Sequence, residues 1–216
     1  MEWALLGSLP PEQRRDVVAH ARPRRFARRE VIFHEGDPGD SMHLVARGHA
    51  AVRTSTPYGD TATIRVIGPG GWFGEMALID PAPRSATVVA VEACETLVLT
   101  RDALDALRQR HAAVDRVLLT AAVTEVRRLT AALLDTMYVP LSTRLNRQLV
   151  ALAATYAAQD DGSVVIPLTQ DDLAGLCGTT RPTINQLLAN LAGRGLVEVG
   201  RGKVVVHAPS ALNTGR

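Results

Sequence analysis

Lysine is almost absent from this 216-residue chain. Lys203 is the only one, and all other basic side chains of the Lys/Arg type are arginines. Basic residues number 24 and acidic residues 22, which gives a formal net charge of only +2 at pH 7. So small a charge excludes a protein-wide field that attracts nucleic acid. A basic DNA-binding surface would have to be local.

Cysteines and clustered metal ligands are also scarce. Cys94 and Cys177 lie far apart without ligand-like spacing, which excludes a disulfide framework and an obvious zinc or iron–sulfur site. His34, His43 and His49 are scattered over strand-like segments, a pattern more typical of structural histidines than of a haem site. We therefore expect no metal, haem or iron–sulfur cofactor.

Membrane-spanning and catalytic patterns are missing as well. No window approaches the roughly 18 to 20 apolar residues that cross a bilayer, and the opening "MEWALLGSLPPEQ" lacks the basic start of a secretory signal. No nucleophile–base pair stands out. These absences predict a cytoplasmic protein that is not an enzyme and has no membrane partner. The length allows one large domain or two ordinary ones.

What the chain does contain changes along its length. Between residues 25 and 100, short alternating or β-branched runs such as "MHLVARGHAAVRT" and "SATVVAV" are separated by glycines. This spacing is typical of a small antiparallel barrel or sandwich. We assign residues 1–110 to this β-rich domain, and the chain as a whole to the α+β class.

A helical segment follows. Residues 101–137 contain no glycine or proline and show a helical period. Steps of three and four residues form a heptad-like seam that predicts a dimerisation helix over 111–138, ended by Pro140. The alternative is a helix that packs on the core of its own domain. The seam residues are Leu119, Ala122, Val126, Leu129, Leu133 and Thr136.

The last third, 139–216, predicts a winged helix-turn-helix. A first helix should run from Leu141 to Ala158. Thr169 with Asp172 resembles a capping box, and Gly178 should end the helix that it opens. Thr180 is a natural N-cap for a second helix, and the alternating "LVEV" and "VVVH" segments form the hairpin of the wing.

The start of the second helix carries side chains of the kinds that contact bases in the major groove of DNA. Arg181, Asn185 and Gln186 lie off its apolar face, where arginine suits guanine and asparagine or glutamine suits adenine. The alternatives are a helical domain with solvated faces, or a protein-binding module. The predicted DNA-contacting residues are Thr169, Thr180, Arg181, Thr183, Asn185, Gln186, Arg201 and Lys203.

Three stretches resemble the Crp–Fnr family of bacterial transcription regulators. They are "EVIFHEGDPGDSMHLVARG", "FGEMALIDPAPRSATV" and "LTQDDLAGLCGTTRPTINQLLANL", and the likeness runs from about residue 5 to 208. The resemblance implies a jelly-roll-like cyclic-nucleotide-binding β-barrel, a long dimerisation helix and a C-terminal winged helix-turn-helix. It also implies a homodimer that binds double-stranded DNA under the control of an effector.

The middle stretch implies the effector site. In cyclic-nucleotide binders of the family, the glutamate matching Glu75 accepts from the ribose 2′-OH and the arginine matching Arg84 pairs with the cyclic phosphate. The alternative is that the two pair only with each other in an effector-independent barrel. The predicted effector residues are Gly74, Glu75, Met76, Ala77, Arg84, Ser85, Ala86, Leu129 and Thr130.

Two departures from the family pattern bear on specificity. Leu129 and Thr130 stand where cyclic-AMP-binding relatives have a Thr-Ser pair that contacts adenine, so one hydroxyl is kept and the other is replaced by a seam leucine. The resemblance implies cyclic AMP as the effector, with cyclic GMP or none as alternatives. Pro182 replaces a glutamate that accepts from cytosine in the best-known member. We therefore expect a guanine-anchored palindrome of partly different sequence. By analogy, the loop 159–163 could contact RNA polymerase.

Overall fold

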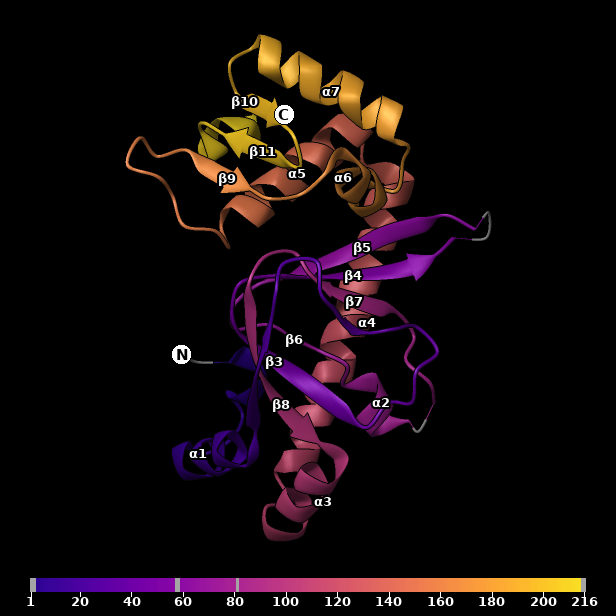
Figure 1. Ribbon diagram of the computed structural model, residues 1–216, viewed down its shortest axis with the longest axis vertical. Helices are drawn as coiled ribbons and strands as arrows, with labels where there is room; N and C mark the ends of the chain where they lie inside the picture. The colour runs from indigo at the N-terminus through magenta and orange to yellow at the C-terminus, as the bar shows by residue number, and fades with distance from the viewer. Residues whose placement is uncertain (1–2, 57–58, 81, 215–216) are drawn as a thin grey trace. The chain divides into compact units, whose positions relative to one another are not determined.

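The computed structural model describes residues 3–56, 59–80 and 82–214 (Figure 1). The chain forms two compact units. The first comprises Met1–Thr54 and Ile67–Thr130, and the second comprises Ser55–Val66 and Ala131–Arg216. Within the described residues, no helix combines the length and apolar character needed to cross a membrane.

Eight strands form the β-rich part, in two four-stranded sheets ordered β1-β8-β3-β6 and β2-β7-β4-β5. Strand pairing is antiparallel, with Met42 opposite Leu99 and Val52 opposite Val88. Their arrangement is the predicted jelly-roll-like barrel, with sheets that do not close fully. The strands are β1 (Arg22–Phe26), β2 (Val31–Phe33), β3 (Ser41–Arg47), β4 (Ala50–Ser55), β5 (Thr61–Ile67), β6 (Trp72–Phe73), β7 (Thr87–Ala90) and β8 (Cys94–Thr100).

Helices cover one sheet of the first unit. They are η1 (Ala4–Leu6), α1 (Pro11–His20), α2 (Met76–Ile79), α3 (Arg101–Arg110) and α4 (Val114–Tyr138), of which α4 continues into the second unit. One apolar cluster joins strand residues to α3 and α4, so burial of these side chains fixes the helices on the sheet. Its members include Met42, Leu44, Leu78, Leu99, Leu104, Leu107, Val114, Val117, Leu118 and Ala121.

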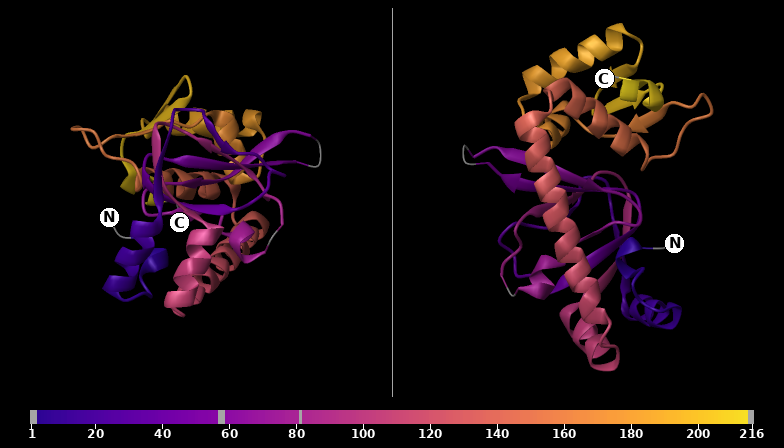
Figure 2. Two further views of the ribbon diagram at one scale, coloured as in Figure 1. Left: turned by 60° about the horizontal axis from the view of Figure 1, so that its bottom comes forward. Right: turned by 180° about the vertical axis from the view of Figure 1, so that it is seen from behind.

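The helical run 101–137 is interrupted, which the sequence period does not predict. Between α3 and α4 the chain leaves helical geometry at His111, with φ −137° and ψ 94°. The ring of His111 contacts Asp16 of α1 (Nε2 to Oδ2, 2.8 Å). A tertiary contact thus replaces local helix propensity at this point. After the break, α4 is one unbroken helix (Figure 2, right).

One apolar stripe of α4 remains exposed beside the residues that pack on the sheet. Val117, Leu118 and Ala121 are buried. The predicted seam side chains Leu119, Val126, Leu129 and Leu133 are each at least half exposed. Ala122 is intermediate. An apolar stripe of this kind is unusual on the surface of a monomer.

The second unit contains the predicted winged helix-turn-helix. Its elements are α5 (Leu141–Ala153), β9 (Val164–Ile166), α6 (Gln170–Cys177), α7 (Arg181–Gly193), β10 (Val197–Gly200), β11 (Lys203–Val206) and η2 (Pro209–Thr214). The capping box at Thr169 and Asp172 is present, and Gly178 ends α6 in the left-handed region with φ 61°. These local signals confirm the sequence prediction.

The first helix of this unit is shorter than expected. It ends at Ala153 instead of Ala158. The backbone N–H and the hydroxyl of Thr155 both donate to the carbonyl of Leu152 (2.9 and 2.8 Å). A side chain that hydrogen-bonds locally in this way competes with helix continuation. The apolar positions Leu145, Leu149 and Leu152 remain buried as predicted.

Candidate effector site and nucleic-acid interface

The predicted effector residues surround a tight turn between β6 and α2. Gly74 occupies it with φ 82°, a conformation that side chains rarely adopt. A Cβ added there would lie 2.8 Å from Arg84 Nη1 and 3.0 Å from the Ser41 carbonyl oxygen. Glycine is therefore required both for the turn and for the close approach of Arg84. We call Gly74, Glu75, Arg84 and Ser85 the clamp.

Arg84 is buried and held mainly by main-chain carbonyls. Its Nη1 donates to the carbonyls of Ser41 (2.7 Å) and Gly74 (3.0 Å), and its Nη2 donates to Ser41 Oγ (3.1 Å). The guanidinium lies over the Phe33 ring, 4.1 Å from its centroid. Nε has no hydrogen-bond partner within the part of the chain that the structure describes. The guanidinium is thus fixed in place, and its Nε–H is left without an acceptor in that part of the chain.

The charge of Arg84 is only partly compensated. Burial lowers its pKa, while the carboxylates of Asp40, Asp37 and Glu75 act in the opposite direction. The carboxylate oxygen Asp40 Oδ1 lies 3.9 Å from Nη2, which is too far for a direct hydrogen bond. A buried cation with this environment favours an anion that completes its hydrogen bonding.

Behind Arg84 lies an aromatic layer with a neutral histidine. His43 stacks on Phe73 with ring centroids 4.8 Å apart and 10° between planes, and its Nδ1 contacts Thr96 Oγ1 (3.1 Å). Burial, followed by the charges of Arg84 and Arg24, lowers the pKa of His43 to about 3. The imidazole is therefore uncharged at neutral pH and can sit near the guanidinium without repelling it.

The remaining predicted residues of this region differ in exposure. Glu75 is buried, 5% exposed, in the turn beside Arg84. Ala77 and Ala86 are buried, whereas Met76 and Ser85 are exposed and in mutual contact (Ser85 Oγ to Met76 Sδ, 3.8 Å). The structure thus brings together residues 74–77 and 84–86.

Leu129 and Thr130 lie on α4, outside the group just described. Both are exposed, and the Thr130 hydroxyl donates back to the Val126 carbonyl (2.9 Å). Their part in the effector site stays a prediction.

Sequence reasoning missed the residues that position Arg84. They are Phe33, Asp40 and Ser41, together with Gly39, where an added Cβ would lie 2.2 Å from the Cβ of Ala77. Three of them belong to the "GDPGDS" stretch that we used only for the family resemblance. A glycine- and aspartate-rich loop before a buried strand is a turn signal. Such a signal does not predict the hydrogen bond between Ser41 and Arg84, which lie 43 positions apart.

The predicted DNA-contacting residues gather on α6, α7 and the wing. Ile184, Leu188 and Leu191 are the buried face of α7, and Arg181, Asn185 and Gln186 are exposed. Arg181 Nη1 contacts Asp171 Oδ2 (3.3 Å), a pair that the sequence does not reveal. At the other predicted positions, Thr180 Oγ1 contacts Thr183 Oγ1 (3.0 Å), and Thr169 contributes its hydroxyl to the capping box.

The wing tip supplies the remaining predicted contacts. Arg201 and Lys203 are exposed where β10 turns into β11. Strand β9 pairs with β11, so the wing hairpin is part of a three-stranded sheet. An exposed helix start and a basic hairpin tip are the two features with which winged helix-turn-helix modules meet DNA.

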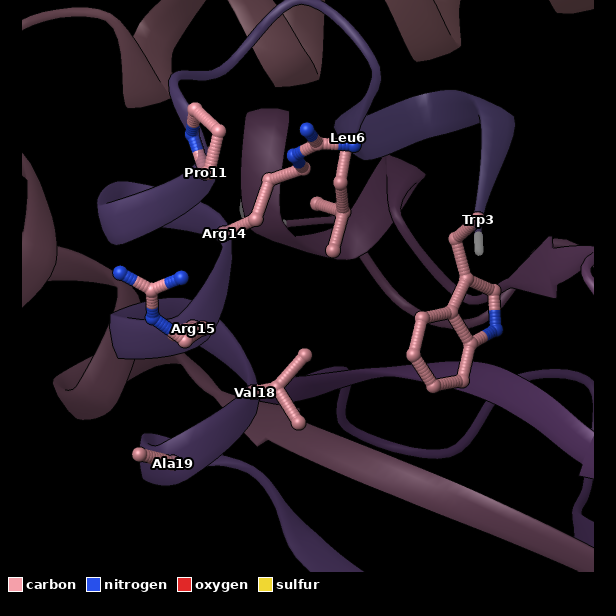
Figure 3. Close-up of a pocket in the computed structure, with 7 residues that line it drawn as sticks. All are labelled: Trp3, Leu6, Pro11, Arg14, Arg15, Val18 and Ala19. Atoms are coloured by element: carbon pink, nitrogen blue, oxygen red, sulfur yellow. The ribbon is translucent and has the colours of Figure 1, made fainter. Parts of the chain in front are cut away.

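A separate hollow of about 530 Å³ lies near the start of the chain (Figure 3). It shares no residue with the clamp. Trp3, Leu6 and Val18 form its apolar lining, and α1 adds Arg14 and Arg15. Among the described residues, no cluster of three histidine, cysteine or acidic side chains could hold a metal ion.

Two family models match the chain. The cyclic nucleotide-binding domain matches residues 23–111, and the Crp-like helix-turn-helix domain matches residues 143–214. These matches agree with the positions of the clamp and of α6 and α7. The chain therefore has a cyclic-nucleotide-binding domain followed by a DNA-binding helix-turn-helix domain.

Characterised relatives align over nearly the whole chain. The cyclic AMP receptor protein of Thermus thermophilus is 33% identical over 208 residues, 96% of this chain and 94% of the relative. The CRP-like cAMP-activated global transcriptional regulator of Mycobacterium tuberculosis is 29% identical over 196 residues, 90% of this chain and 87% of the relative. The crystal structure of the Thermus thermophilus catabolite activator protein superposes with a TM-score of 0.56 at 31% identity, covering 96% of this chain and 95% of that one. The chain belongs to the Crp–Fnr family of DNA-binding transcription regulators.

Proposed function

We propose that the protein is a homodimeric transcription regulator whose binding to a palindromic operator is controlled by cyclic AMP. The observation that best supports a cyclic-nucleotide effector is the environment of Arg84. The guanidinium of Arg84 is buried, and Ser41 and Gly74 hold it in place; among the described residues its Nε has no hydrogen-bond partner, and the Asp40 carboxylate lies 3.9 Å away. A cyclic phosphate supplies the anion that this environment favours.

Glu75 and Ser85 complete the phosphate–ribose half of the proposed site. The Glu75 carboxylate would accept the ribose 2′-OH, and backbone N–H groups near Gly74–Ala77 and Ser85 would add to the phosphate cradle. The choice of cyclic AMP follows the names of the Thermus and Mycobacterium relatives. In our proposal Thr130 contacts the base and Leu129 packs beside it, with cyclic GMP as the competing ligand.

The exposed stripe of α4 is the proposed dimer interface. Burying Leu119, Ala122, Val126, Leu129 and Leu133 against the same stripe of a second copy would remove this apolar surface from water. A two-fold dimer presents two α7 helices to successive major grooves, about 34 Å apart. The operator is therefore expected to be a palindrome.

In this proposal the start of α7 contacts the DNA bases. Arg181 would contact guanine, and Asn185 and Gln186 would contact adenine. Arg201 and Lys203 would contact phosphates, which fix the register without reading sequence. Thr169, Thr180 and Thr183 would hydrogen-bond to the backbone at the same groove. Effector binding would shift the population towards the DNA-competent arrangement.

The same proposal gives a role to each part of the chain. We propose that residues 1–110 sense the effector, 111–138 dimerise and 139–216 bind DNA, in a cytoplasmic regulator that is not an enzyme. The loop 159–163 is the proposed contact for RNA polymerase. In that loop hydrogen bonding from the Ser163 side chain, followed by that from its backbone N–H (2.9 Å), lowers the pKa of Asp161.

Titration calorimetry with cyclic AMP and cyclic GMP tests the effector proposal directly. We expect heat and saturation with cyclic AMP at one site per chain, in a protein that sedimentation shows to be a dimer. Operator fragments selected from random DNA should then bind more tightly with the nucleotide than without it. No binding of either nucleotide by the folded dimer would reject the effector.

A second candidate is a regulator of the same family that binds DNA without a small molecule. The observation in its favour is that both terminal nitrogens of Arg84 already donate to Ser41 and Gly74. In that case the barrel serves structure and dimerisation only. Equal operator affinity with and without cyclic nucleotide would select this candidate over the first.

A further inference from the structure

Arg101 joins the effector region to the helices that follow it. It is the first residue of α3, and its side chain reaches the carboxyl end of α2. Nη2 donates to the Ala77 carbonyl, and Nη1 makes a longer contact with the Leu78 carbonyl (3.5 Å). Carbonyls at a helix end lack intrahelical partners, and a cation near them is favourable. Arg101 therefore caps the short helix that begins inside the clamp.

The main chain of Arg101 makes a second connection to the clamp. Its N–H donates to the Asp40 carbonyl (2.7 Å). The Asp40 carboxylate accepts from Ser41 Oγ (2.9 Å), and Ser41 in turn holds Arg84. One residue thus contacts both segments that position the clamp, namely the loop before β3 and helix α2.

Helix α3 is in turn linked to α4 through a shared apolar cluster. Leu104 and Leu107 of α3 share an apolar cluster with Val114, Val117 and Leu118 of α4. Leu78 of α2 belongs to the same cluster. Because such interiors are close-packed, a displacement at one member is passed to its neighbours. A shift of α2 can therefore reach α4 in two ways, through the hydrogen bonds of Arg101 and through the apolar cluster.

We infer that Arg101 is a positioning residue that transmits the state of the clamp to α3 and α4. This inference rests on the proposed function. A cyclic phosphate that engages Arg84 and the turn at Gly74 moves α2 and the loop at Asp40 relative to each other. Arg101 is bonded to both, so it converts that movement into a displacement of the first turn of α3. Without it, the nucleotide still binds but α4 no longer responds.

The test compares Arg101→Gln with Arg108→Gln in the full-length protein. Arg108 lies on the same helix and has exposed ion pairs to Asp105 and to Asp115 of α4. Among the described residues it has none to α2 or to the loop at Asp40, so it controls for the loss of an arginine that does not reach the clamp. Two quantities are measured: the Kd for cyclic AMP by calorimetry without DNA, and the ratio of operator affinities with and without saturating cyclic AMP by fluorescence anisotropy. Arg101→Gln should lower the ratio about tenfold or more, with a Kd within about threefold of wild type. Arg108→Gln should match wild type in both.

Each other result decides against the inference. A wild-type ratio in Arg101→Gln would show that Arg101 transmits nothing, and a matching loss of cyclic AMP affinity would make it a ligand-binding residue instead. If wild type itself shows no nucleotide effect, the proposed function fails, and this inference fails with it. The two failures are distinguishable because the first leaves the wild-type response intact.

A conservative variant covers the case in which Arg101→Gln does not fold. Arg101→Lys keeps the positive charge but replaces the planar two-nitrogen fork by a single ammonium group. Its ratio should lie between those of wild type and of an unresponsive protein, at an unchanged thermal midpoint. A ratio equal to that of wild type would overturn the need for the two-carbonyl contact.

Discussion

The clamp and the start of α7 each depend on one arginine, in opposite surroundings. The side chain of Arg84 is 4% exposed and makes three hydrogen bonds to Ser41 and Gly74. The side chain of Arg181 is 57% exposed and has one ion pair, to Asp171. Folding has already positioned the first arginine, whereas binding has to order the second. Substitutions at the clamp should therefore have larger effects than substitutions on α7.

Removing Arg84 should give the largest effect. Arg84→Ala should weaken cyclic AMP binding by at least about 100-fold, because a buried charged hydrogen-bond partner is worth about 2–5 kcal/mol. Calorimetry measures the affinity, with exposed Arg28→Ala as the control. A variant that keeps nucleotide affinity but loses several degrees in melting temperature would make Arg84 a purely structural residue.

His43 provides a pH-dependent test of the same buried region. Its folded pKa is about 3 against an ordinary 6.5. Below pH 6.5 the unfolded chain takes up a proton at this position that the folded chain refuses, so stability should fall with falling pH. The contribution is about 2 kcal/mol between about pH 6 and pH 4.5.

Chemical denaturation of His43→Gln at several pH values isolates this contribution. The amide keeps a partner for Thr96 but does not titrate, so the variant should lose less stability than wild type on acidification. The exposed His34→Gln is the matched control. Parallel pH profiles for wild type and His43→Gln would contradict a buried neutral imidazole.

At the exposed region, Arg181→Ala should have a moderate and sequence-dependent effect. The expected loss is about 1–3 kcal/mol of operator affinity, confined to the guanine position of the half-site. Anisotropy titrations with operators substituted at each position measure it. An equal loss on every sequence would instead identify Arg181 as a phosphate contact.

The smallest expected effect comes from the partner of Arg181. Asp171→Asn removes an exposed ion pair worth about 0–1 kcal/mol. It also removes a negative charge that competes for the same guanidinium. Operator affinity should therefore rise slightly, about two- to fivefold. Asp160→Asn, in the loop 159–163, is the control for a general change in charge, and an equal gain there would reject the local explanation.

The two regions also differ in how far the sequence predicts them. At α6 and α7 the signals are local: Thr169 with Asp172, Gly178 and Thr180 mark helix ends within a few residues. Helix boundaries and the exposed face of α7 could therefore be predicted. The Arg181–Asp171 pair could not, because long exposed side chains have many alternative partners.

At the clamp, by contrast, the sequence predicts the candidate effector residues but not what holds them. Glu75 and Arg84 stand out as charges in apolar surroundings. The environment of Arg84 depends on Ser41 and Phe33, more than 40 positions away, and on the missing Cβ of Gly39. The break at His111 has a similar cause, since Asp16 lies on another helix. Contacts between distant segments leave no periodic trace in the sequence.

The scarcity of lysine gives the wing a chemical consequence. Because Lys203 is the only lysine and is exposed at the wing tip, an amine-reactive dye can label one side chain, apart from the N-terminal amine. That label would sit on the hairpin proposed to touch the DNA backbone. The protein thus offers a native single-site handle for a fluorescent reporter of operator binding, without any engineered cysteine.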